Sequence, residues 1–102
     1  MSNITYADTH ATCEALPCMD GTRKAFHSKN TCILVNPDGA RLLLSQGMLV
    51  MAIKDGQLLP IAPWSDLGTI QKRHVGNFVR YVLGRRLGWD EYADAWRALQ
   101  DD

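Results

Sequence analysis

TCILVNPDGARLLLSQGMLVMAIKDGQLLPIA, residues 31–62, is the stretch that decides the fold, because short apolar runs alternate in it with residues typical of turns. The first turn, NPDGA, contains a proline that presets φ and an Asp-Gly pair that tolerates positive φ. A second such pair, Asp55-Gly56, follows later. We therefore predict a meander of about three or four antiparallel strands from Thr31 to Ala62. The runs are TCILV (31–35), RLLLS (41–45), MLVMAI (48–53) and LLPIA (58–62).

The strands of this meander should be buried on both faces. Strict alternation of apolar and polar residues marks a strand with one wet face, but LLL at 42–44 and MLVMAI at 48–53 are apolar at every position. Two C-terminal helices are the candidates for covering the second face. Pro60 has no N–H to donate, which predicts that the last strand lies at an edge of the sheet or ends early.

Two amphipathic helices are predicted after the meander. The first spans 69–83, with Thr69 as its N-terminal cap and Gly84 as its end. At about 100° per residue its apolar side chains share one arc, opposite its cationic side chains. The second spans about 90–99 and begins with acidic residues, which the helix dipole favours. The apolar arcs are Val75, Phe78, Val79 and Val82 in the first helix and Tyr92, Ala95, Trp96 and Leu99 in the second.

We predict one α+β domain over residues 1–102. With 102 residues and 46 % apolar content, the chain is long enough for one core and too short for two comfortable domains. For residues 1–30 we predict a short helix from Asp8 to Ala15 and an irregular segment. The remaining elements are the three- to four-stranded antiparallel β-meander (31–62), the amphipathic helix packed against it (69–83) and the short C-terminal helix (90–99).

Composition excludes strong global electrostatic attraction. The 11 basic and 11 acidic residues give a net charge of zero, so no overall field draws the chain to nucleic acid or to an anionic membrane. Its apolar runs are far shorter than the roughly 20 residues of a spanning helix, and MSNITYADTH lacks the features of a secretion signal. We expect a soluble cytoplasmic protein without membrane association.

The stretch TIQKRHVGNFVRYVLGRR, residues 69–86, is cationic and contains no carboxylate. It can be the solvated outer face of an amphipathic helix, a surface for a protein partner, or a surface for nucleic-acid phosphates. The neutral net charge and the absence of interleaved exposed aromatic residues argue against the last. The candidate partner- or nucleic-acid-binding residues are Lys72, Arg73, Arg80, Arg85 and Arg86.

No motif specifies a reaction, a metal or a cofactor. A zinc site would have to use His10, Cys13, Cys18 and His27, but structural zinc sites favour tight ligand pairs such as C-x2-C, which are missing. Neither a nucleophile elbow nor a phosphate-binding glycine loop is present. We expect a protein that is not an enzyme, without metal or cofactor. Its odd number of cysteines predicts free thiols, with Cys13 and Cys32 as small buried side chains.

Several aromatic residues are predicted to have structural roles. His74 lies near the boundary of the apolar arc, where an imidazole packs its ring and donates a hydrogen bond to a carbonyl group. Trp64 precedes the same helix and should cover the meander. Trp89 or Trp96, if exposed, offers a contact between subunits, so monomer and homodimer both stay open.

Three segments share a family pattern: TRKAFHSK (22–29), LLSQGMLVM (43–51) and WSDLGTIQKRHVGNFV (64–79). The pattern resembles a family of short proteins, a domain of unknown function, that is common in bacteriophages and mobile elements. Its most specific part is the ungapped spacing from Trp64 through His74 to Phe78. The chain departs from it where Gln46 replaces an aromatic residue, and Leu67-Gly68 and Ile70-Gln71 replace hydroxyl-bearing pairs. The matching positions are Arg23, Lys24, Phe26, Ser45, Val50, Trp64, His74 and Phe78.

The resemblance implies a small phage or mobile-element accessory protein. Proteins of that type often inhibit host defence stoichiometrically, anti-CRISPR proteins among them, by occupying a surface on a host complex. Our leading hypothesis is such a protein-binding factor. Its expected partner is a host protein complex, and one version of the hypothesis makes that complex CRISPR-associated. The acidic residues of this chain are too few to mimic DNA, which favours inhibition by blocking a surface through shape. The alternative is a small nucleic-acid-binding module that uses the basic face of residues 69–86. The acidic residues considered are Asp90, Glu91, Asp94, Asp101 and Asp102.

Overall fold

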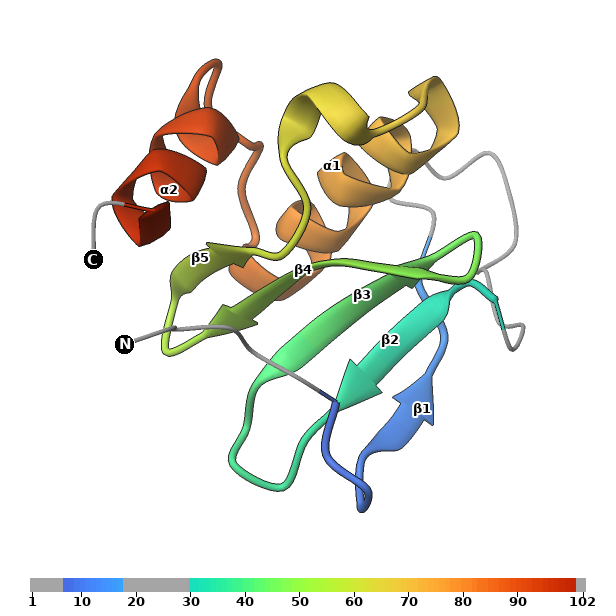
Figure 1. Cartoon of the computed structure of the whole chain (residues 1–102). Coiled ribbons are helices and arrows are strands. Elements are labelled where there is room, and N and C mark those ends of the chain that lie inside the picture. Colours follow the sequence, from blue (N-terminus) through green and yellow to red (C-terminus); the bar gives the residue numbers. More distant parts are fainter. Residues whose placement is uncertain (1–6, 18–29, 101–102) are drawn as a thin grey trace.

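The computed structural model describes residues 7–17 and 30–100. Within them, a five-stranded antiparallel sheet in the order β1-β2-β3-β4-β5 is accompanied by two α-helices and one 3-10 turn (Figure 1). The α+β class is confirmed, and the sheet contains more strands than predicted. The elements are β1 (Thr12–Glu14), β2 (Cys32–Val35), β3 (Arg41–Ser45), β4 (Met48–Lys54), β5 (Gln57–Pro60), η1 (Trp64–Asp66), α1 (Thr69–Leu83) and α2 (Glu91–Gln100).

Tight turns set the register of the meander. Strands β3 and β4 are joined by Gln46-Gly47, and β4 and β5 by Asp55-Gly56. All four residues have positive φ, between 52° and 82°, as a two-residue type I′ hairpin requires, and glycine adopts this conformation without steric cost. Pro60 is the last residue of β5, which is an edge strand, so the prediction from its missing N–H is confirmed.

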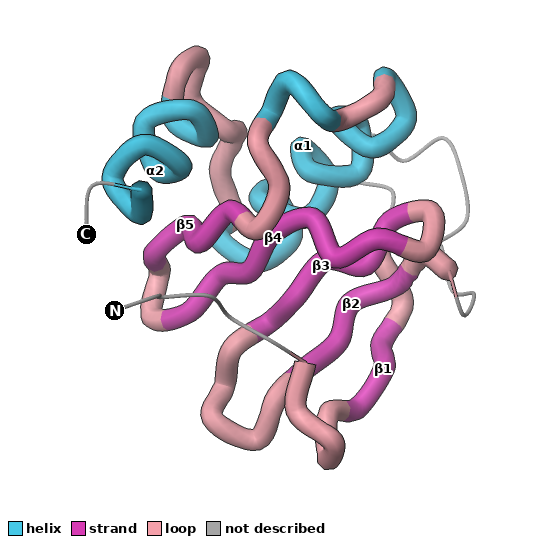
Figure 2. The backbone as a smooth tube through the Cα atoms, viewed as in Figure 1, coloured by secondary structure: helices cyan, strands magenta, loops and turns pink. Residues whose placement is uncertain are grey.

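The sheet buries apolar side chains on both faces, as the continuous apolar runs predicted. On one face the buried side chains of β2, β3 and β4 pack against Val75, Phe78 and Val79 of α1 and against Tyr92 of α2. The other face carries a smaller cluster of Ala40, Leu42 and Ala52. Both helices therefore belong to one face, with α1 across β3 and β4 and α2 beside β5 (Figure 2).

The N-terminal helix predicted for Asp8 to Ala15 is wrong. The chain forms β1 there, which pairs antiparallel with β2 in the register Thr12↔Val35 and Glu14↔Ile33. Main-chain hydrogen bonds to the open edge of β2 outweigh the weak helical preference of so short a segment. The strand exposes Cys13, which we predicted to be buried, whereas Leu16 just after it is fully buried.

Helix α1 has the predicted length but a different N-terminal cap. Gly68, not Thr69, is the capping residue, and the N–H of Gly68 donates to Oε1 of Gln71 at 3.0 Å. At the other end Gly84 adopts the left-handed conformation, with φ of 71°, and donates to the carbonyl of Arg80 at 2.9 Å. This turn ends the helix as predicted and aims the following residues toward α2.

Helix α2 is attached to the sheet through Tyr92. The hydroxyl of this buried residue lies 2.5 Å from the carbonyl oxygen of Ala62 and 3.1 Å from that of Val50. Burial raises the pKa of the Tyr92 phenol, so it stays a protonated donor. Among the residues described, no helix combines the length and apolar character needed to cross a membrane.

Candidate interaction surface

Arg73, Arg80 and Arg86 come together around one surface hollow of about 340 Å³, which we call the arginine hollow. Arg73 and Arg80 are two helical turns apart on α1, so their side chains leave the helix on the same side. Arg86 reaches the hollow because the turn at Gly84 folds the chain back beside the helix. The rest of its lining is Gly76, Asn77 and Leu87.

These three arginines face no compensating charge within the described part of the chain. The ion pairs found there involve other cations, namely Arg41 with Glu14, Lys54 with Asp38, Arg85 with Glu91 and Arg97 with Asp94. Three guanidinium groups around one hollow repel each other, and each presents planar donors suited to carboxylate or phosphate oxygens. The arginine hollow therefore presents donors of the type that bind carboxylate and phosphate oxygens.

The other two predicted binding residues are engaged elsewhere. The Nζ of Lys72 lies 5.2 Å from the centre of the Trp64 ring, which is the geometry of a cation–π contact. Arg85 forms a bidentate ion pair with Glu91, at 2.8 Å and 2.6 Å. Of the five predicted binding residues, Arg73, Arg80 and Arg86 therefore line the arginine hollow, whereas Lys72 and Arg85 contact Trp64 and Glu91.

The Glu91 carboxylate holds the loop between the two helices in place. It accepts both Arg85 hydrogen bonds and a further one from the N–H of Gly88 at 2.9 Å. These donors stabilise the ionised form and lower the pKa of Glu91 to about 2. Residues 84–90 are therefore tied at both ends, by the Gly84 turn and by Glu91.

Trp89 projects from this loop with its side chain 97 % exposed. It borders a second hollow, of about 330 Å³, that we call the tryptophan hollow. Leu87 lines both hollows, so they adjoin. The lining of the tryptophan hollow is Trp64, Leu87, Gly88, Trp89, Asp90, Tyr92 and Ala93.

The sequence interpretation assigned no exposed aromatic residue to the basic stretch 69–86, but Tyr81 within it is 39 % exposed, and Trp89 just beyond it is almost fully exposed. Trp89 follows Arg86 closely in the chain and shares the 84–90 loop with it, so an aromatic side chain does accompany the cations. The missed signal was the Gly-Trp-Asp sequence between two helices, where the apolar arc of neither helix includes the tryptophan. We considered Trp89 only as a possible subunit contact.

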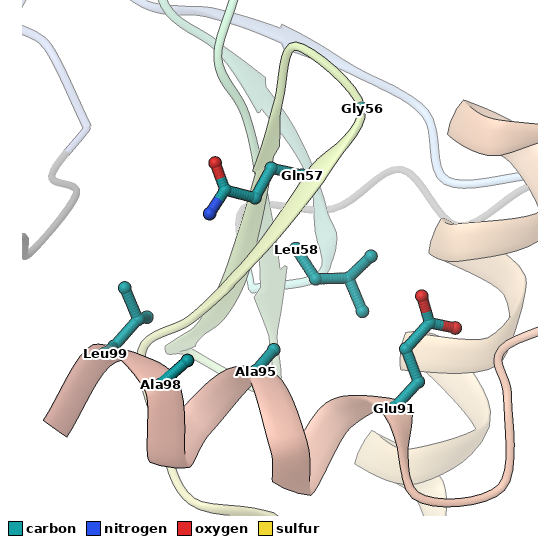
Figure 3. A pocket seen from close by; sticks show the side chains of 7 residues that line it. All are labelled: Gly56, Gln57, Leu58, Glu91, Ala95, Ala98 and Leu99. Carbon is teal, nitrogen blue, oxygen red and sulfur yellow. The ribbon is translucent and has the colours of Figure 1, made fainter. Parts of the chain in front are cut away.

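A third hollow, of about 500 Å³, separates α2 from the edge strand β5 (Figure 3). It exists because Ala95 and Ala98 are too short to fill the space in front of Leu58 and Gln57. Its charged group is Glu91, which is already engaged by Arg85. Unlike the two hollows beside residues 84–90, it presents neither an available charge nor an exposed aromatic ring.

His74 and Ser45 form a buried pair under α1. The Ser45 hydroxyl lies 2.7 Å from Nδ1 of His74, and the residues are 0 % and 4 % exposed. The ring is packed inside the protein, as predicted, and one of its hydrogen-bond partners is a hydroxyl on β3. Since solvent and ligands do not reach the pair, its position indicates a role in joining the helix to the sheet.

Acidification is expected to destabilise the protein through His74. Burial, with a smaller contribution from Arg73, lowers the pKa of His74 below its ordinary value of 6.5. Below that pH the unfolded chain gains a proton that the folded protein excludes. The free energy of unfolding should therefore fall by up to about 1.4 kcal/mol per pH unit, until His74 protonates in the folded state as well.

Urea unfolding of the wild type and of His74→Gln between about pH 8 and pH 5 measures this dependence. The variant should be less stable throughout and its stability should change less over the range. Equal slopes in the two proteins would show that another group carries the dependence. The Glu91 carboxyl group has a pKa of about 2, lowered from its ordinary value of 4.5. Its contribution to stability is therefore lost only as the pH falls below about 4.5, outside the range in which His74 acts.

Two of the cysteines lie in the described ranges. Cys13 and Cys32 are both free thiols. Burial and the neighbouring Cys13 raise the pKa of Cys32 to about 12, which keeps it protonated and unreactive. No group of three potential metal ligands occurs within 7–17 and 30–100. Cys18 and His27, two of the zinc ligands considered, lie outside these ranges.

Comparison of the chain with protein-family models, curated proteins and solved structures found no match. The resemblance to short phage and mobile-element proteins thus stays an expectation from the residue pattern. The structure gives its most specific residues packing roles: Phe78 is fully buried, His74 is bonded to Ser45, and the partly buried Trp64 packs on Tyr92 with ring centres 5.2 Å apart. These positions explain the spacing through packing, whereas Arg73, Arg80, Arg86 and Trp89 form the exposed surface available for binding.

Proposed function

We propose that this protein acts by stoichiometric binding to a protein partner, through the surface formed by the arginine hollow and the tryptophan hollow. The observation that carries the proposal is the 97 % exposure of Trp89 on a loop that ion pairing holds in place. A tryptophan has on the order of 200 Å² of mainly apolar surface, whose burial at about 25 cal/mol per Å² is worth several kcal/mol. Association with a partner would recover that energy.

The residue types of this surface favour a protein as the partner. Tryptophan and arginine are the residues most enriched among interface hot spots, and here Trp89 stands beside Arg73, Arg80 and Arg86. The ties at Gly84 and Glu91 also reduce the entropy that the loop loses on binding. The proposed activity involves neither catalysis nor a cofactor.

In the finer form of the proposal, the partner is a host protein complex, and the protein is a cytoplasmic phage or mobile-element factor that inhibits host defence in the manner of anti-CRISPR proteins. This form rests on the family resemblance. Blocking by shape suits the structure better than mimicry of DNA, because Glu91 and Asp94 are neutralised by Arg85 and Arg97. Few free carboxylates remain on α2 to imitate a phosphate backbone.

A nucleic-acid-binding module is the second candidate. Arg73, Arg80 and Arg86 form no ion pair with the residues that the structure describes, and beside an exposed tryptophan they can contact phosphates while the ring stacks on a base. Against it, Asp90 lines the tryptophan hollow and the chain has no net positive charge. If phosphates were the ligand, Arg73→Glu with Arg80→Glu would remove binding and flatten its dependence on salt.

The test is an affinity pull-down of the tagged protein from bacterial lysate, with one half treated with nuclease, read by quantitative mass spectrometry. A protein recovered in near-equal amounts from both halves supports the proposal. A profile that collapses on nuclease treatment would assign the surface to nucleic acid. Sedimentation of the purified protein tests the competing use of Trp89, a homodimer, which would show twice the mass of the 11.4 kDa chain.

A further inference from the structure

Gly76 is a residue of α1 whose presence packing does not explain. It lies in the interior of a 15-residue helix, where glycine is less stable than alanine because its backbone loses more freedom on folding. Its φ is ordinary for a helix, and among the residues that the structure describes an added Cβ would meet no atom within 4 Å outside the helix backbone. Alanine would therefore fit, and the fold alone gives no reason for glycine.

The arginine hollow gives a reason. Gly76 lies between Arg73 and Arg80 on the helix and lines the hollow together with Asn77 and Leu87. Because Gly76 has no side chain, the floor of the hollow at this position is the helix backbone itself. A glycine that lowers helix stability, between two arginines of a cationic hollow, is what close approach of a ligand to the backbone requires.

We propose that an acidic segment of the protein partner docks in the arginine hollow, directly against Gly76. Its carboxylates receive hydrogen bonds from Arg73, Arg80 and Arg86, and an adjacent large apolar side chain enters the tryptophan hollow across Leu87. The proposal rests on the proposed function and specifies the chemistry of the partner.

Charge complementarity identifies a peptide and not a nucleic acid as the occupant. The arginine hollow has three cations that form no ion pair with any residue in 7–17 or 30–100, whereas the adjoining tryptophan hollow is lined by apolar groups and by the carboxylate-bearing Asp90. A phosphodiester chain carries a charge on every unit and would bring phosphates close to Asp90. A protein segment can place carboxylates in one hollow and an apolar side chain in the next.

The experiment is selection of random peptides displayed on phage, with the folded full chain as bait. Wild-type protein should enrich peptides in which at least about two Asp or Glu residues flank a large apolar residue. The baits Gly76→Ala and Arg73→Glu/Arg80→Glu should bind a selected synthetic peptide about tenfold more weakly or worse. Arg97→Glu changes an exposed arginine of α2 outside the hollow and should bind it like the wild type.

Thermal unfolding separates this effect from misfolding, since Gly76→Ala should raise the melting temperature by roughly 2–6 °C while it weakens binding. Selected peptides without acidic enrichment, or unchanged affinity in Gly76→Ala, would overturn the inference. Displacement of the peptide by a tighter-binding single-stranded oligonucleotide would overturn it in favour of nucleic acid. If the pull-down yields a stoichiometric partner but the selected peptides show no acidic preference, the inference fails and the proposed function stands. If the pull-down yields no stoichiometric partner, the proposed function itself fails.

Discussion

Trp89→Ala is expected to weaken binding of the partner recovered in the pull-down at least about 30-fold without changing the fold. The side chain is 97 % exposed, so its removal takes nothing from the core. At an interface, truncation of a central tryptophan costs about 2–4 kcal/mol, which corresponds to roughly 30- to 1000-fold weaker binding. Isothermal titration of wild-type and variant protein with the purified partner measures the difference.

Ile70→Ala is the matched control for this substitution. Ile70 is also a large exposed apolar residue, 51 % exposed, but it lies in the first turn of α1 and lines neither hollow. The Ile70→Ala variant should bind the partner with wild-type affinity. Both variants should melt within a few degrees of the wild type, and equal affinities of Trp89→Ala and wild type would refute the role of Trp89.

Phe78→Ala is expected to have the largest effect on stability. Phe78 is fully buried between α1 and the sheet, and truncation of a buried phenylalanine costs about 3–5 kcal/mol. Because small domains are stable by only about 5–15 kcal/mol, the variant should unfold at a much lower denaturant concentration. Guanidinium unfolding followed by circular dichroism measures the shift of the midpoint.

Two further variants keep this prediction testable if Phe78→Ala does not fold. Phe78→Leu should fold and lose less stability, since it removes fewer atoms from the core. Tyr81→Ala removes a 39 % exposed ring from the same helix and should cost less than about 1 kcal/mol. A cost for Phe78→Ala no greater than that for Tyr81→Ala would contradict the assignment of Phe78 to the core.

Local sequence signals predicted the central part of the fold well. The positive φ values of Asp55 and Gly56 realise a turn that the Asp-Gly pair indicates, and Gly84 ends α1 where the helical pattern stops. These features depend on residues adjacent in the chain. Strand β1 was mistaken for a helix because its pairing with β2 joins residues about 20 positions apart in the chain, such as Thr12 and Val35, and three residues are too few to display a period.

The candidate site was predicted only where it depends on residues close together in the chain. The spacing of Arg73 and Arg80 on one helix indicates a shared face, and the structure confirms that they line one hollow. The ion pair of Arg85 with Glu91 depends on the fold of the 84–90 loop, which the helical pattern does not describe. The exposure of Trp89 also follows from the path of that loop, so the helical pattern did not indicate Trp89 as a binding residue.

Amide hydrogen exchange of the protein alone and bound to its partner tests the central claim most directly. We predict slower exchange in residues 84–90 and in the middle of α1 around Gly76, with little change in β1. Protection confined to β1, the open edge of the sheet at Thr12–Glu14, with unchanged exchange in residues 84–90, would contradict it and would indicate binding by strand addition.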